Sequence, residues 1–113
     1  AVFEAICTIG RRVQKRHGLP IGHITLSIDP IHDNYENMER MMGILQGLLR
    51  QSDVICRDGK EVRILLFNTG DIGCGIVERR LVRVLDRTGL SRVRAKIEVF
   101  ESKDTRTRAV AHQ

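Results

Sequence analysis

The chain has 113 residues, a mass of 12.8 kDa and a formal net charge of +5. Its hydrophobic share of 42% and charged share of 29% are ordinary for a globular domain and exclude an intrinsically disordered chain. The positive charge favours an anionic partner, but an aromatic share of 4% without Trp argues against base stacking on nucleic acid. We therefore expect one domain and no nucleic-acid partner.

Neither membrane insertion nor metal binding is indicated. No apolar run approaches the roughly 20 residues that cross a bilayer, and no secretory signal pattern is visible. We expect a cytoplasmic chain that does not insert into a membrane itself, although its parent protein can be tethered to one. Three cysteines without Cys-x-x-Cys spacing and four scattered histidines predict neither a disulfide framework nor a metal site.

The first half of the chain alternates helical and strand patterns. Apolar residues recur at helical spacing over residues 2–17. Residues 24–29 alternate apolar and polar side chains, which predicts a strand with one buried face. Asp33 and Glu36 have the spacing of a capping box, and the apolar stripe that follows predicts a helix over residues 34–50.

The second half begins with a hairpin. Residues 54–57 and 62–67 are strand-like and flank an Asp-Gly dipeptide, which is typical of a tight turn between antiparallel strands. An amphipathic helix follows over residues 72–85, and residues 93–99 alternate as a last strand. Residues 102–113 are polar and basic, and we expect them to form a frayed tail.

This order predicts an α+β fold, in which an N-terminal helix precedes a ferredoxin-like β-α-β-β-α-β sheet. The domain is expected to cover residues 1–101. Many unrelated functions use this layout, so function has to be argued from particular residues.

The segment over residues 50–67, RQSDVICRDGKEVRILLF, resembles the centre of the GGDEF family of diguanylate cyclases. In that family an Arg-x-x-Asp inhibitory site at the end of a helix precedes a strand with an Arg and then the Gly-Gly-Asp/Glu-Glu-Phe hairpin. Arg50 and Asp53 match the inhibitory site, Arg57 matches the Arg of the strand, and Gly59 matches the first Gly of the signature.

A second segment supports the resemblance. Residues 76–80, IVERR, are similar to the family's Ile-Ala-Glu-Arg helix, in which Arg79 takes the place of a second inhibitory-site arginine. Arg83 lies one turn further along the same helix and would add a phosphate contact. The resemblance covers about residues 2–100 and implies the fold of a nucleotide-cyclase palm.

The catalytic half of the family pattern is degenerate. The resemblance places Ser27 and Val62 where cyclases carry carboxylates for two divalent cations, and neither side chain replaces a carboxylate. Lys60 replaces the second Gly of the signature and Arg63 replaces its Phe. The segment between residues 29 and 50, where the family carries a guanine-recognising Asn, is shortened. We therefore expect no enzymatic activity.

The inhibitory-site chemistry is retained. An Arg fork can donate two hydrogen bonds to guanine O6 and N7, and a carboxylate can accept from N1–H and N2–H. The resemblance thus implies a cyclic di-GMP receptor of the PelD type, which binds through Arg50, Asp53, Arg79, Arg57 and Arg83 and requires no cofactor. The ligand is expected as an intercalated dimer.

The expected role is that of a signalling effector in bacterial biofilm or exopolysaccharide control. Its output would pass to other domains of a longer parent or to a partner protein. The alternative is a GGDEF-fold module that binds no nucleotide and serves only in dimerisation or docking, with Arg50 and Asp53 paired at the surface.

Overall fold

The computed structural model describes residue 8, residues 19–90, residues 92–100 and residues 105–110. The predicted N-terminal helix over residues 2–17 lies outside the described residues, apart from the helical Thr8. The elements are, in chain order, β1 (Ile21–Ser27), the 3-10 helix η1 (Pro30–His32), α2 (Tyr35–Leu48), β2 (Val54–Asp58), β3 (Glu61–Phe67), α3 (Asp71–Arg87), β4 (Arg94–Phe100) and β5 (Thr105–Val110).

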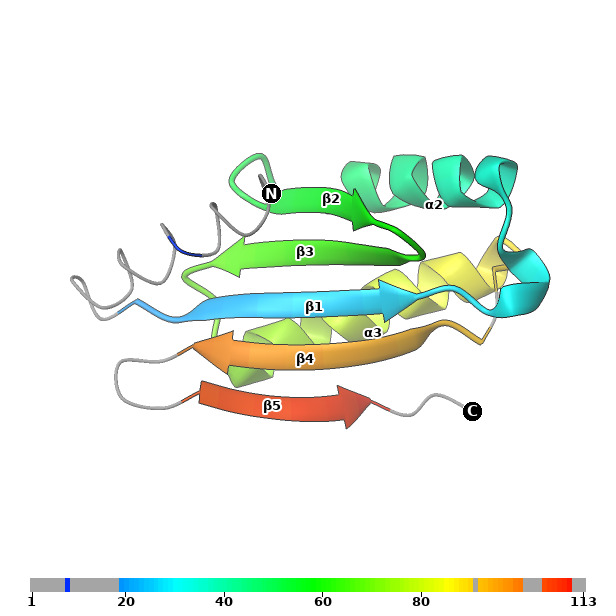
Figure 1. Ribbon diagram of the computed structural model, residues 1–113. Coiled ribbons are helices and arrows are strands. Elements are labelled where there is room, and N and C mark those ends of the chain that lie inside the picture. Colours follow the sequence, from blue (N-terminus) through cyan, green and yellow to red (C-terminus); the bar gives the residue numbers. More distant parts are fainter. Residues whose placement is uncertain (1–7, 9–18, 91, 101–104, 111–113) are drawn as a thin grey trace.

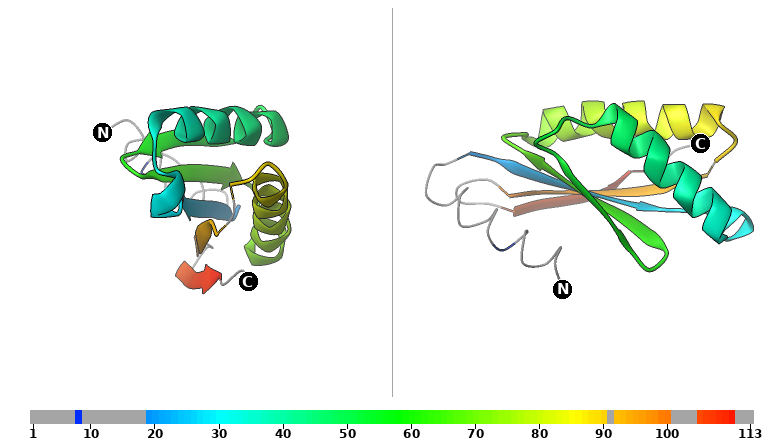
Figure 2. Two further views of the ribbon diagram at one scale, coloured as in Figure 1. Left: turned by 90° about the vertical axis from the view of Figure 1, so that its right-hand side faces the viewer. Right: turned by 90° about the horizontal axis from the view of Figure 1, so that it is seen from above.

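The strands form one five-stranded sheet in the order β2-β3-β1-β4-β5, and all neighbouring strands are antiparallel (Figure 1). The first four strands and two helices follow the predicted β-α-β-β-α-β order, so the α+β, ferredoxin-like fold is confirmed. Both helices lie on the same face of the sheet, as the views in Figure 2 show.

The core lies between this face and the two helices. Strand β1 is central, with Ile24 paired to Ile64 of β3 on one side and to Ile97 of β4 on the other. All three side chains are fully buried. The stripe of methionines and leucines on α2 is also part of this core, because Met41 and Leu45 are inaccessible to solvent.

Helix α3 approaches β1 closely at Gly22. A Cβ atom at this position would overlap Sγ of the fully buried Cys74, which lies in the first turn of α3. Glycine at position 22 therefore allows the start of α3 to pack directly on the central strand, and this packing fixes where the rest of the helix lies.

Two element boundaries differ from the sequence prediction. Strand β1 begins at Ile21 and ends at Ser27, whereas the prediction was 24–29. The side chain of Asp29 instead accepts a hydrogen bond from Ile31 N at 2.9 Å, which caps η1. The capping box at Asp33 is also wrong: Asn34 is the N-cap of α2 and accepts from Asn37 N at 2.8 Å.

The predicted frayed tail is wrong for residues 105–110. These residues form β5, which pairs with β4 along its whole length, from Phe100 opposite Thr105 to Ala95 opposite Val110. Neither helix in the part of the chain that the structure describes has the length and apolar character of a membrane-spanning segment.

Candidate ligand-binding site

The Arg-x-x-Asp motif forms a tight turn between α2 and β2. Asp53 N donates to Arg50 O at 3.0 Å, and Arg50 N donates to Asp53 Oδ2 at 2.8 Å. The two side chains are also joined, because Arg50 Nη2 lies 2.9 Å from Asp53 Oδ1 and Arg50 Nε lies 3.3 Å from both carboxylate oxygens. The motif therefore folds onto itself where the helix ends and the strand begins.

The two side chains of this pair differ in exposure. The Arg50 side chain is 58% exposed, whereas the Asp53 side chain is 3% exposed. Hydrogen bonding to Asp53, together with its negative charge, raises the pKa of Arg50 above its ordinary value. In this arrangement Asp53 orients Arg50, and Arg50 is the member of the pair that faces solvent.

The loop between β3 and α3 provides further contacts to Arg50. Arg50 Nη2 donates to Phe67 O at 3.1 Å and to Thr69 Oγ1 at 3.1 Å. Asn68, between these two residues, has a positive φ of 54°, which turns the chain away from the strand before α3 starts. The arginine thus bridges two segments that are distant in the sequence.

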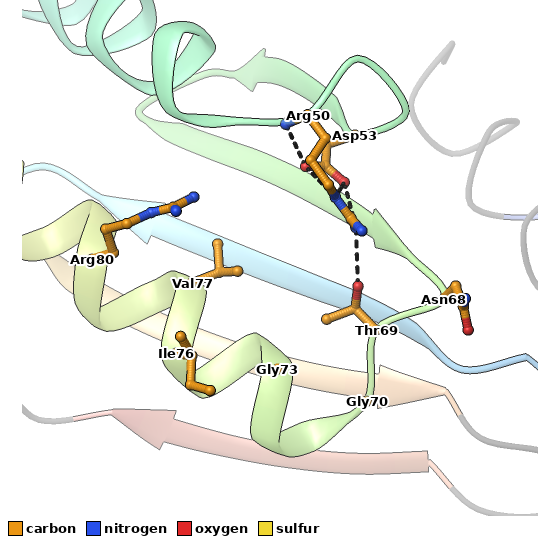
Figure 3. Close-up of a pocket in the computed structure, with 9 residues that line it drawn as sticks. All are labelled: Arg50, Asp53, Asn68, Thr69, Gly70, Gly73, Ile76, Val77 and Arg80. Atoms are coloured by element: carbon orange, nitrogen blue, oxygen red, sulfur yellow. Dashed lines mark hydrogen bonds and ion pairs between the residues drawn. The ribbon is translucent and has the colours of Figure 1, made fainter.

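A cavity of about 460 Å³ opens beside this bridge (Figure 3). Its lining comes from the Arg-x-x-Asp turn, the β3–α3 loop and one side of α3, and consists of Arg50, Asp53, Asn68, Thr69, Gly70, Gly73, Ile76, Val77 and Arg80. Arg80 Nη2 donates to Leu48 O, in the last turn of α2, at 2.8 Å. Two arginines from different elements therefore face one cavity.

The structure brings together only part of the predicted site. Arg50 and Asp53 line the cavity, whereas Arg79 and Arg83 are exposed on α3 and do not line it. Arg57 lies on β2, where its Nε donates to Gly59 O at 3.2 Å in the hairpin turn. Among the cavity residues that the sequence analysis did not assign to the site, Arg80 is the charged one.

The phase of α3 explains why Arg80 was missed. Glu78 is 1% exposed and faces the core with Leu81 and Leu85. Arg80 lies three residues after Val77 and shares its side of the helix, whereas Arg79 lies about 200° around the helix from Val77. Matching the letters Glu-Arg to the family helix selected Arg79, whereas the arginine of α3 that lines this cavity is Arg80. The buried positions of the apolar pattern were the sequence signal for which side of α3 faces the cavity.

The edge of the sheet at Ser27 and the β2–β3 hairpin holds the residues that the resemblance matches to the metal site of the cyclases. Ser27 is paired in register with Glu61, and Ser27 Oγ donates to Glu61 Oε2 at 3.3 Å. Val62, which the resemblance matches to the glutamate in fourth place of the signature, is fully buried in the core, because side chains alternate between the two faces along β3. Lys60 Nζ lies 3.4 Å from Asp33 Oδ2.

Among the residues that the structure describes, no group of three or more His, Cys, Asp or Glu side chains could hold a metal ion.

Comparisons with known proteins give matches in structure. No protein-family model matches the chain, and no curated protein matches it in sequence. The active GGEEF domain of a diguanylate cyclase from Vibrio cholerae matches with a TM-score of 0.69 at 17% identity, over 85% of this chain and 72% of that one. PelD from Pseudomonas aeruginosa PA14 in complex with cyclic di-GMP matches with a TM-score of 0.65 at 22% identity.

The match to PelD covers 84% of this chain and 37% of the PelD chain. The diguanylate cyclase SiaD from Pseudomonas aeruginosa, in complex with its activator SiaC, matches with a TM-score of 0.60 at 21% identity, over 81% of this chain and 42% of that chain. The chain thus spans less than half the length of these two matched chains. At these identities the comparisons establish that the chain has the fold of GGDEF domains.

Proposed function

We propose that this domain is a receptor for cyclic di-GMP and binds it in the cavity between the Arg-x-x-Asp turn and α3. One observation carries the proposal: Arg50 and Arg80, from separate elements, face a single cavity of about 460 Å³ whose wall also holds Asp53. The presence of both cyclases and the cyclic di-GMP complex of PelD among the matching folds supports this choice of ligand.

The chemistry of the cavity suits a purine dinucleotide. A guanidinium can donate two hydrogen bonds to the O6 and N7 edge of guanine, stack on the base or pair with a phosphate. Arg50 is held in place by Asp53, so little rotamer freedom is lost when a ligand binds. Ile76 and Val77 add apolar surface against which a base can pack.

We also propose that the domain does not synthesise the dinucleotide. Two-metal phosphoryl transfer needs oxygen ligands for both ions. Ser27 donates to Glu61, which also pairs with Arg63, and Lys60, which replaces the second Gly of the signature, pairs with Asp33 in the segment before α2. The domain then acts as an effector in the cytoplasm. Its signal passes to other domains of a longer protein or to a partner protein, and the process that it regulates is biofilm formation or exopolysaccharide production.

The first prediction concerns binding. Calorimetric titration of the purified chain with cyclic di-GMP is expected to show saturable binding with a stoichiometry near two, because the bases of one molecule can stack between those of another. GTP and a DNA duplex are the comparators, and both should bind more weakly. Absence of binding would favour the docking module, and a clean stoichiometry of one would contradict the intercalated dimer.

The second prediction concerns catalysis. The purified chain, incubated with GTP and either Mg²⁺ or Mn²⁺, should form no cyclic di-GMP, because Ser27 and Val62 stand where the resemblance places the carboxylates that hold both ions. Chromatography of the nucleotides, with an active diguanylate cyclase as the positive control, is the measurement. Product above the level of a protein-free sample would show that the domain is an enzyme.

A further inference from the structure

Thr69 is a rigidly held residue at the rim of the cavity. Its backbone N donates to Pro20 O at 3.1 Å, which ties the loop to the residue before β1. Its Cγ2 lies so close to Gly73 that a Cβ built on that glycine would sit 2.8 Å away. With its backbone bonded on one side and its methyl group packed on the other, the hydroxyl group has a fixed direction.

The oxygen of that hydroxyl group is a hydrogen-bond acceptor for Arg50. Thr69 Oγ1 accepts from Arg50 Nη2 at 3.1 Å and donates to Phe67 O at 3.0 Å, so both of its roles are occupied. Asp53 holds the Nε and Nη2 side of the same guanidinium. Within the described part of the chain no hydrogen bond involves Arg50 Nη1, so the N–H groups of this nitrogen remain available to a ligand.

We infer that Thr69 is a positioning residue for ligand binding: its hydroxyl fixes the guanidinium of Arg50 across the mouth of the cavity. This inference rests on the proposed function and deepens it. An arginine side chain that is 58% exposed samples many rotamers unless several acceptors fix it. Asp53 bonds Nε and Nη2 from the Arg-x-x-Asp turn, whereas Thr69 Oγ1 and Phe67 O accept from Nη2 on the β3–α3 side, so Thr69 ties the guanidinium to a second segment of the chain.

The third prediction follows from this role. Thr69→Val keeps the β-branched shape and the packing against Gly73 but removes the hydroxyl group. The affinity for cyclic di-GMP should fall about three- to tenfold, as expected for a lost hydrogen bond to a charged group. Thr69→Ser keeps the hydroxyl group and should bind within about twofold of the parent chain. Calorimetric titration of folded variants is the measurement.

A thermodynamic cycle separates positioning from a general structural effect. In an Arg50→Ala background, Thr69→Val should cause no further loss of affinity, because the group that Thr69 holds is absent. Equal affinities of the parent and Thr69→Val, or an undiminished loss in the Arg50→Ala background, would overturn the inference.

One further readout is independent of the ligand. In the unliganded chain, NMR exchange of the Arg50 side-chain N–H protons with water should be faster in Thr69→Val than in the parent or in Thr69→Ser. If the parent bound no cyclic di-GMP at all, the proposed function would fail. This exchange rate would still decide whether Thr69 holds Arg50, and identical rates in the parent and Thr69→Val would overturn that contact.

Discussion

Gly22→Ala is expected to destabilise the domain by about 1–3 kcal/mol, which corresponds to a fall of roughly 5–20 °C in the midpoint of thermal unfolding. The added methyl group would overlap Sγ of Cys74, and Cys74 is fully buried and cannot turn out to solvent. Either α3 moves away from β1 or the sulfur displaces its neighbours. Both outcomes loosen the core at the helix that carries one wall of the cavity.

Two further variants make this prediction specific. In the double variant Gly22→Ala/Cys74→Ala the sulfur is absent. The atoms nearest to the new Cβ of residue 22 are then Thr69 O at 3.4 Å and the β-carbon of residue 74 at 3.7 Å, so this variant should recover much of the lost stability. Gly43→Ala on α2 meets nothing within 4 Å and should be neutral or stabilising. Thermal unfolding of all four chains is the measurement. A Gly22→Ala chain as stable as the parent would contradict the proposed close packing.

Hydrophobic periodicity was sufficient to predict the fold because both helices and the strands β1, β3 and β4 carry regularly spaced buried apolar residues. The alternation at Ile24 and Leu26 identified the central strand. The prediction missed the start of that strand because Gly22 has no side chain to continue the pattern. It missed β5 because the residues TRTRAV show little apolar alternation, and a strand held by backbone pairing to β4 leaves no hydrophobic signal.

The candidate site was predictable in part. Arg50 and Asp53 are close in the sequence and form one turn, so the motif alone located them. The contributions of Thr69 and Arg80 depend on how the β3–α3 loop and α3 pack against the end of α2, and this packing is a property of the tertiary structure. The spacing of residues that are close in the sequence predicts a turn. It does not predict which residues from distant segments line the other side of a cavity.

Arg80→Ala is expected to weaken cyclic di-GMP binding by about fivefold to over a hundredfold. Loss of a two-pronged arginine contact to guanine is worth roughly 1–3 kcal/mol, and Arg80 is the arginine that α3 presents to the cavity. Arg79→Ala is the matched control, because it removes the same group one residue away. Arg79 is exposed and does not line the cavity, so its loss should change the affinity by about twofold or less.

Side-by-side calorimetric titration of the parent, Arg50→Ala, Arg80→Ala and Arg79→Ala with cyclic di-GMP tests the receptor site most directly. These arginines lie outside the core, and circular dichroism should confirm that each variant remains folded. The account predicts that the parent and Arg79→Ala bind with similar affinity, while Arg50→Ala and Arg80→Ala each bind much more weakly. Undiminished binding by the folded Arg50→Ala and Arg80→Ala chains would contradict it.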